Sequence, residues 1–196
     1  MNPVQQHDHP APYRPDDLVD AALNAATGPR LVILIDGRSG AGKTTMAHDL
    51  VDRLGARLGR PVALVRLDDC YPGWYGLSAA ARAVVETILR PVNPGYRRYD
   101  WTLGRAAEWV ELPATGPLIV EGAGSLTPES ALLADLSVWV DADEAVRRRL
   151  AIQRDGATFE PWWDVWSDQE LAHLTKHHPD ELADVRVDPI RGLAWW

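Results

Sequence analysis

Cysteine is almost absent from this sequence. Cys70 is the only cysteine among 196 residues, so no disulfide can form within the chain. A chain without disulfides is typical of a reducing compartment. The composition, with 46% hydrophobic and 24% charged residues, is that of an ordinary globular protein whose core is stable without cross-links.

Long apolar runs and an excess of basic residues are missing as well. No apolar segment approaches the roughly 18 residues of a membrane-spanning helix, and the N-terminus lacks the basic and apolar regions of a signal peptide. The formal net charge is −8, which argues against nucleic acid as a partner because duplex binding requires a basic surface. We therefore expect a cytoplasmic protein that binds neither membranes nor nucleic acid.

The start of the chain shows no hydrophobic period. Residues 1–15 contain four prolines and two histidines, which predicts a flexible tail. Residues 16–196 are of a size for a single domain. Asp16 is expected to cap the first helix of that domain, which ends before Gly28-Pro29.

Apolar runs and amphipathic segments alternate through the rest of the chain. Strands are predicted at 31–35, 62–67, 118–120, 136–140 and 185–187. Helices are predicted at 17–26, 43–58, 79–89, 143–154 and in the tryptophan-rich segment 159–178, with a loop at 91–100. This alternation indicates an α/β fold, doubly wound around a mostly parallel sheet.

A phosphate-binding loop stands between the first strand and the helix that follows it. Residues 37–44 read Gly-Arg-Ser-Gly-Ala-Gly-Lys-Thr, which satisfies the P-loop (Walker A) pattern in the strand–loop–helix context that it requires. Small residues allow the backbone to wrap a phosphate with its N–H groups inward. Lys43 is expected to reach the β- and γ-phosphates, and Thr44 to ligate Mg²⁺. The predicted site for ATP or GTP comprises Gly37, Arg38, Ser39, Gly40, Ala41, Gly42, Lys43, Thr44 and Thr45.

Acidic residues follow the other predicted strands. Asp68 comes after the strand at 62–67 and Glu121 after that at 118–120. Ligands of doubly wound folds bind at the carboxyl ends of the strands, so these side chains are expected beside the P-loop. Asp141 is a second candidate for the acid on the metal side. Glu121 is preferred because Gly122-Ala123-Gly124 leaves room for a ligand, whereas Asp141 fits the start of the next helix.

The order of these motifs resembles that of the uridine kinases, which are related to phosphoribulokinase and bacterial pantothenate kinase. Residues 67–71 are similar to the Asp-x-Phe-Tyr element of that family, and 99–101 to the Tyr-Asp element that holds the sugar of the substrate. Residues 120–122 are similar to its Glu-Gly, and 140–155 to the helix that enters its lid. The resemblance extends from about residue 31 to 190.

The resemblance implies an ATP-dependent kinase that phosphorylates a hydroxyl of a small molecule, such as a nucleoside or sugar-like compound. Asp68 would then accept the proton of the hydroxyl, and Glu121 would orient Mg²⁺ with Thr44. Arg147 and Arg154, two helical turns apart, would stabilise the charge of the transferred group together with Lys43. A lid is implied at about 155–180. The implied substrate-binding residues are Asp68, Tyr71, Arg97, Arg98, Asp100 and Trp101.

The sequence departs from the family where the substrate and the lid are concerned. Leu150 and Ala151 stand where the uridine kinases have further lid arginines, and Cys70 replaces the phenylalanine before the substrate tyrosine. The nucleotide machinery therefore transfers to this chain, while uridine as the acceptor does not. A secondary metabolite or antibiotic is an alternative acceptor. A regulatory ATP or GTP switch with slow hydrolysis is an alternative of another class, but it would have no need of a base such as Asp68.

Several residues admit a purely structural role. Tyr71 fits a half-buried packing position, and Asp100 fits an ion pair with Arg98. The tryptophans at 162, 163 and 166 fit either packing of the lid or stacking on a planar substrate. Trp195-Trp196 could dock on the same molecule or on the mate of a homodimer, and the sequence leaves this open. The histidines are expected on a solvated helix face, namely His173, His177 and His178.

Overall fold

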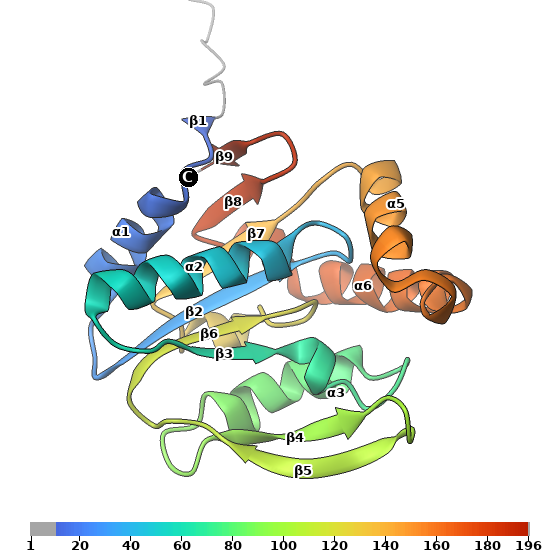
Figure 1. Ribbon diagram of the computed structural model, residues 1–196, viewed down its shortest axis with the longest axis horizontal. Coiled ribbons are helices and arrows are strands. Elements are labelled where there is room, and N and C mark those ends of the chain that lie inside the picture. The colour runs from blue at the N-terminus through green and yellow to red at the C-terminus, as the bar shows by residue number, and fades with distance from the viewer. Residues whose placement is uncertain (1–10, 196) are drawn as a thin grey trace, which may run out of the picture.

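A seven-stranded sheet forms the centre of the protein (Figure 1). The computed structural model describes residues 11–195, apart from the side chains of Asp155, Ala157 and Trp195. The strands are β1 Ala11–Pro12, β2 Arg30–Gly37, β3 Ala63–Arg66, β4 Gly95–Asp100, β5 Arg105–Glu111, β6 Gly116–Glu121, β7 Leu136–Val140, β8 Val185–Asp188 and β9 Leu193–Trp195. The helices are α1 Pro15–Ala25, α2 Lys43–Leu58, α3 Leu77–Ala83, α4 Pro128–Ala131, α5 Glu144–Asp155, α6 Trp163–His177 and α7 Pro179–Leu182.

The sheet is mostly parallel, as the alternating sequence pattern predicts. Its strand order is β1-β9-β8-β7-β2-β6-β3. Pairing is parallel from β8 through β7, β2 and β6 to β3, and antiparallel where β9 joins β8 and β1. The α/β fold class is therefore confirmed. None of the helices among the described residues has the length and apolar character needed to cross a membrane.

Both faces of the central strands are buried, which explains their unbroken apolar runs. On β2, Leu31, Ile33 and Ile35 pack in the cluster that contains α1 and α2. Val32 and Leu34 point to the opposite face and pack with residues of α3 and α6. Figure 1 shows α1 and α2 in front of the sheet and α3 behind it.

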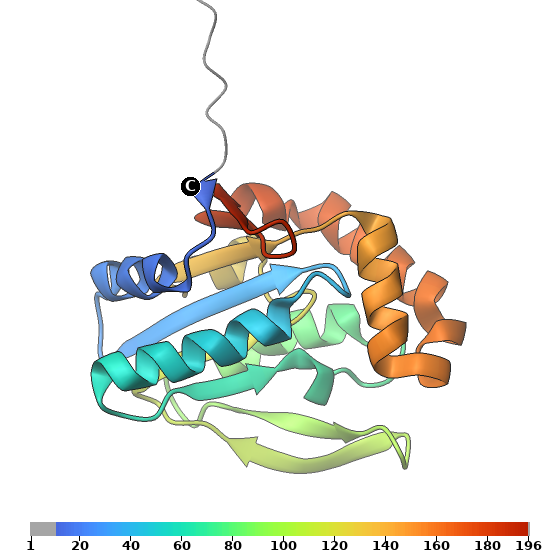
Figure 2. The same cartoon turned by 45° about the horizontal axis from the view of Figure 1, so that its top comes forward.

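The carboxyl ends of the parallel strands meet at one edge of the sheet. The P-loop follows β2, a short 3₁₀ turn at Leu67–Asp69 follows β3, and Glu121 is the last residue of β6. Figure 2 shows α5 and α6 at this same end. The fold thus gathers the loop, the two acids and both late helices in one place.

The prediction of a loop at 91–100 is wrong for the second half of that segment. Gly95–Asp100 forms β4, which pairs antiparallel with β5 as a separate two-stranded ribbon. Most of its side chains are exposed or half-buried, and only Gly95 and Tyr96 of β4 are buried. A ribbon with so little buried area has no continuous apolar run, so hydrophobic patterning gives only a weak signal for it.

The tail predicted at 1–15 is partly contradicted. Residues 1–10 lie outside the described part of the chain, but Ala11–Pro12 forms β1, which pairs with β9. Helix α1 begins at Pro15 and its cap position is Arg14 rather than Asp16, because proline is favoured in the first turn of a helix. The side chain of Asp16 instead accepts a hydrogen bond from Arg53 at 2.9 Å.

Candidate functional site

The P-loop wraps tightly between β2 and α2. Gly40 and Gly42 have φ angles of +79° and +100°, a region that other residues rarely adopt. A Cβ atom on Gly40 would lie 2.1 Å from the carbonyl oxygen of Arg147, so the loop also packs closely against α5. Because Lys43 is the first residue of α2, the backbone N–H groups at the start of that helix face the space at the loop, as an anion site requires.

Lys43, Thr44 and Glu121 lie together beneath the loop. Lys43 Nζ donates to the carbonyl of Arg38 at 3.1 Å. Thr44 Oγ1 donates to Glu121 Oε1 at 3.0 Å, and Glu121 is only 2% exposed. Burial raises the pKa of Glu121 above its ordinary value, while the charge of Lys43 opposes this shift.

The pair formed by Thr44 and Glu121 fits a magnesium ion. Mg²⁺ prefers oxygen ligands, and in nucleotide sites it uses few protein groups because phosphates and waters complete its coordination. Among the described residues there is no cluster of three or more histidine, cysteine or acidic side chains that could hold a metal unaided. Thr44 and Glu121 are therefore the groups on which such an ion would depend.

Asp68 lies at the border of two neighbouring cavities. The smaller, of about 30 Å³, contains Lys43, Thr44 and Glu121. The larger, of about 540 Å³, adjoins it, and Asp68 and Arg154 line both. A carboxylate between a phosphate-sized space and a larger cavity is in place to receive a proton from a molecule bound in the larger one.

Aromatic side chains dominate the larger cavity. It is lined by Tyr71, Trp74, Trp101, Phe159 and Trp166 together with Ser39, Thr44, Arg66, Asp68, Arg154 and Thr158. Trp74, which the sequence reasoning missed, stacks on Trp162 with the ring centroids 5.4 Å apart. Trp101 Nε1 donates to the carbonyl of Asp68 at 2.8 Å. This bond attaches the end of the β4–β5 ribbon to the turn that carries Asp68.

The hydroxyl of Tyr71 is already engaged within the protein. Tyr71 is 2% exposed, and its hydroxyl donates to the carbonyl of Ala123 at 2.9 Å. Burial raises the pKa of this phenol well above its ordinary value. Its ring contacts Trp166 in a T-shaped arrangement at 4.7 Å. Tyr71 therefore packs in the wall that lines both cavities, and its contact with a substrate stays a prediction.

The structure does not place Arg97, Arg98 or Asp100 among the residues that line either cavity. Arg97 donates to the carbonyl of Ala107 across the ribbon, and Arg98 pairs with Glu108. Asp100 accepts from the N–H groups of Thr102 and Leu103, both at 2.9 Å, and so closes the turn between β4 and β5. These groups stabilise the ribbon, and of the predicted set 97–101 only Trp101 reaches the cavity.

Arg147 contacts the P-loop from α5. It is 1% exposed, and its guanidinium donates to the carbonyls of Ser39 and Ala142, both at 3.1 Å. Burial, followed by the charge of Arg38, lowers its pKa. The inner face of α5 is thus formed by Arg147 and Ala151, while Leu150 is exposed. Arg147 supports the loop, whereas Arg154 lines both cavities.

One face of α6 contacts the P-loop and the residue before it through three polar residues spaced three apart. Ser167 accepts from Arg38 at 3.1 Å. Glu170 accepts from both the N–H and the hydroxyl of Ser39 at 2.7 Å, and its second oxygen lies 3.5 Å from Arg38 Nε. His173 Nε2 lies 3.2 Å from Asp36, the residue before the loop.

This contact corrects the prediction for the histidines in part. His173 is 7% exposed rather than solvated. Polar residues at every third position along α6 are compatible with a face that contacts the P-loop. The same spacing also occurs on a helix whose polar face is exposed to solvent. Trp163 and Trp166 are also buried, so this part of the segment predicted as a lid packs into the core. That the segment moves as a lid stays a prediction.

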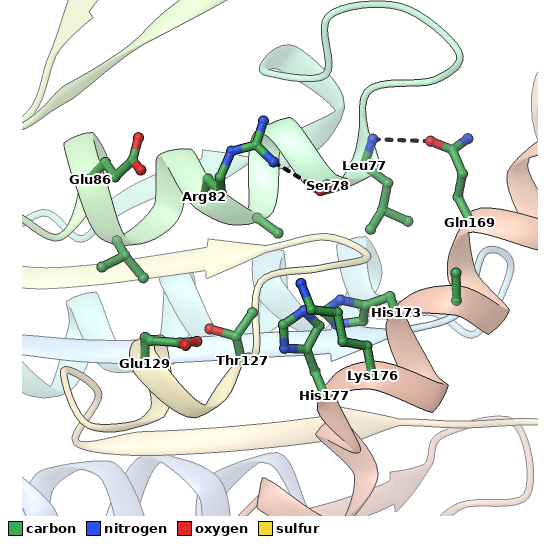
Figure 3. A pocket seen from close by; sticks show the side chains of 13 residues that line it. Leu77, Ser78, Arg82, Glu86, Thr127, Glu129, Gln169, His173, Lys176 and His177 are labelled. Atoms are coloured by element: carbon green, nitrogen blue, oxygen red, sulfur yellow. Dashed lines mark hydrogen bonds between the residues drawn. The ribbon is translucent and has the colours of Figure 1, made fainter.

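A separate cavity, of about 390 Å³, lies between α3 and α6 (Figure 3). Arg82 and Glu86 face it from one side, and Lys176 and His177 face it from the other. It shares His173 with the contact described above but contains no residue of the P-loop. This cavity therefore lies apart from the candidate phosphate site.

Comparison with known proteins identifies the fold. No protein-family model and no curated protein matches the sequence. A solved protein described as a possible uridine kinase, from Bacillus stearothermophilus, is 22% identical, with 89% of this chain and 97% of that one covered and a TM-score of 0.62.

Solved structures of lower sequence identity share the same fold. A candidate fructose transport system kinase from Silicibacter sp. TM1040 has 18% identity, coverage of 83% and 88%, and a TM-score of 0.54. D-glycerate 3-kinase from Cryptococcus neoformans has 15% identity, coverage of 74% and 78%, and a TM-score of 0.50. These likenesses show that the chain has the fold of the P-loop kinases.

Proposed function

We propose that the protein is a kinase that transfers the γ-phosphoryl group of ATP to a hydroxyl of a small molecule. The observation that carries this proposal is the position of Asp68 between the small cavity at the P-loop and the larger aromatic cavity. A protein that only binds and hydrolyses a nucleotide needs a site for water, whereas this arrangement offers a second site for an organic molecule.

The proposed reaction requires little covalent chemistry from the protein. Asp68 receives the proton of the acceptor hydroxyl as the hydroxyl oxygen bonds to the γ-phosphorus. The bond from that phosphorus to the β–γ bridging oxygen breaks, and ADP leaves with its electron pair. Such transfers are loose, so positioning and charge stabilisation matter most. Lys43 and the N–H groups of the P-loop stabilise the phosphates. Mg²⁺, when bound near Thr44 and Glu121, would neutralise phosphate charge.

The larger cavity supports an acceptor with a planar ring. Trp101 is 39% exposed and lines the cavity beside Asp68, so part of its ring is accessible to a ligand. Aromatic rings stack favourably on tryptophan in partly desolvated sites. A nucleoside is the leading class of acceptor, and other sugar-like compounds and aromatic alcohols are tested beside it. The likeness to the Bacillus stearothermophilus protein, a possible uridine kinase, is consistent with this class.

The proposal is tested by ADP release from Mg·ATP across nucleosides, sugars, hydroxy acids and aromatic alcohols, with a blank that lacks an acceptor. We expect one class of acceptor to raise ADP release at least about 10-fold over the blank and to gain the mass of one phosphoryl group. ADP release at the rate of the blank with every acceptor would contradict the proposal and favour a nucleotide switch.

A further inference from the structure

Arg66 lies on the acceptor side of the candidate site. It is the last residue of β3, two residues before Asp68, and it lines the larger cavity with Asp68 and Trp101. It does not line the smaller cavity, where Lys43 and Arg154 lie. Arg66 therefore faces only the larger cavity, whereas Arg154 lines both.

The guanidinium of Arg66 forms no ion pair within the described part of the chain, and its Nε is buried without a hydrogen-bond partner. Its charge acts on Glu121, which stands opposite it on β6, and tends to lower the pKa of that carboxyl. Two other arginines near the P-loop have polar partners. Arg38 binds Ser167 and Glu170, and Arg147 binds two backbone carbonyls.

A half-buried arginine without a partner is costly unless something in the site offsets the lost hydration. Its planar donors match a carboxylate or phosphate, and such charge-assisted hydrogen bonds are among the strongest in proteins. The polar side chains that share the cavity with Arg66 are hydroxyls, Asp68 and the second cation Arg154. Among the described residues that line the cavity, Asp68 is the only carboxylate, and no ion pair joins it to Arg66.

We propose that the acceptor carries an anionic group, a carboxylate or a phosphate, and that Arg66 binds it. This inference rests on the proposed kinase function, and it replaces the neutral nucleoside as the leading acceptor by a ring-bearing alcohol that also carries a negative charge. Arg66 would hold the anion in the larger cavity, while Asp68 faces the hydroxyl. Neutral acceptors would leave the buried donor of Arg66 without a partner and would be disfavoured.

The test measures binding rather than turnover. Ring-bearing alcohols that carry a carboxylate or a phosphate are each paired with a neutral analogue, the primary amide or the dephosphorylated compound. They are titrated against the full chain with Mg²⁺ and a non-hydrolysable ATP analogue, by calorimetry and tryptophan fluorescence. We expect at least one acid to bind about 10-fold or more tightly than its neutral partner. Separate carboxylate and phosphate arms show which anion is preferred.

Variants of Arg66 show whether this preference depends on its charge. Arg66→Gln should abolish the preference for the anion, and Arg66→Lys should retain part of it because a point charge remains without the planar fork. Arg97→Gln, at an exposed arginine on the ribbon, is the matched control and should bind as the wild type does. Thermal melting of each variant confirms that it is folded.

The outcomes separate this inference from the kinase proposal. The inference is wrong if no acid binds the wild type more tightly than its neutral partner, or if the preference survives in folded Arg66→Gln. Arg66-dependent binding of acids without transfer of a phosphoryl group would support the anion site and contradict the kinase. Efficient transfer to neutral acceptors, unchanged in Arg66→Gln, would support the kinase and overturn the anion site.

Discussion

Asp68 and its neighbour Asp69 offer a matched pair of side chains on one turn. Asp68 lines both cavities, whereas Asp69 lines neither. Replacing Asp68 by asparagine keeps the size of the side chain but removes the group that receives a proton. We expect Asp68→Asn to lower kcat by at least about 10²-fold. The dissociation constant of ATP should change by less than about 2-fold, since the P-loop is untouched.

Asp69→Asn is the control for this prediction and should keep nearly full activity. Steady-state kinetics with the acceptor, together with calorimetric titration of the nucleotide, measure the two quantities separately. Equal turnover in Asp68→Asn and the wild type would show that Asp68 is not the proton acceptor.

Ionisation of Glu121 is expected to make Mg²⁺ binding depend on pH. Burial raises its pKa, so the carboxylate becomes protonated at a higher pH than an exposed glutamate does. A metal ligand must be ionised to bind. The Mg²⁺-dependent part of nucleotide affinity should therefore be complete well above the raised pKa and decline as the pH falls through it. Titration of Mg²⁺ against protein with bound nucleotide at several pH values measures this.

The variant Glu121→Gln distinguishes the role of the carboxylate in Mg²⁺ binding from its effect on the stability of the fold. The variant should bind Mg²⁺ weakly at every pH and lose the decline described above. Because the raised pKa means that the ionised carboxylate is disfavoured in the fold, ionisation destabilises the wild type above the ordinary pKa of glutamate. Without metal at neutral pH, the variant should therefore melt no lower than the wild type. A clearly lower melting temperature would show that the buried charge stabilises the fold.

Helix α6 is the element that contacts the P-loop most extensively through polar side chains. Glu170→Ala would leave the N–H and hydroxyl of Ser39 without their acceptor and would remove an ion-pair partner of Arg38, which keeps its hydrogen bond to Ser167. Leaving buried donors unpaired costs about 1–3 kcal/mol. We expect nucleotide affinity to fall about 10-fold, because the loop no longer holds its binding conformation. Calorimetry and denaturant unfolding measure the two effects.

Asp168 provides the control on the same helix. It is exposed on α6, so Asp168→Ala removes a charge of the same sign without touching the loop. Nucleotide affinity of this variant should match that of the wild type. If both variants bind the nucleotide equally well, the contact between α6 and the P-loop does not contribute to binding.

Gly40 joins the P-loop to α5. A methyl group there would lie 2.1 Å from the carbonyl of Arg147, at a φ of +79° that alanine adopts poorly. Gly40→Ala should therefore destabilise the protein by about 1–3 kcal/mol and weaken nucleotide binding at the same time. Gly28→Ala is the control, since its added methyl meets no atom within 4 Å. Equal melting temperatures for the two variants would contradict this packing.

At the scale of the whole molecule, the sequence predicts what is local or strongly patterned. The P-loop is found because its glycines and Lys43 follow one another along the chain, and the central strands because they are apolar on both faces. The parallel sheet follows from that alternation. The β4–β5 ribbon is missed because it buries little area, and β1 because two residues give no period.

The rest of the site depends on contacts between distant segments. Trp74, Glu170 and His173 are found only in the folded chain, where residues up to 137 positions apart meet. Arg97, Arg98 and Asp100 illustrate the opposite error. A motif suggested substrate contacts, but nearby partners on the ribbon bind these side chains. Spacing along the chain can indicate such groups, but it does not show which partner each of them meets.

The proposed function requires that the γ-phosphoryl group of ATP pass to an organic hydroxyl and not to water. The most direct measurement follows a label in the γ-phosphoryl group of ATP, in the presence of the best acceptor, with Lys43→Ala as the inactive control. The proposed function predicts that the wild type places most of the label in the acceptor and that Lys43→Ala places almost none there. Label found only in inorganic phosphate, at the same rate with and without acceptor, would contradict it.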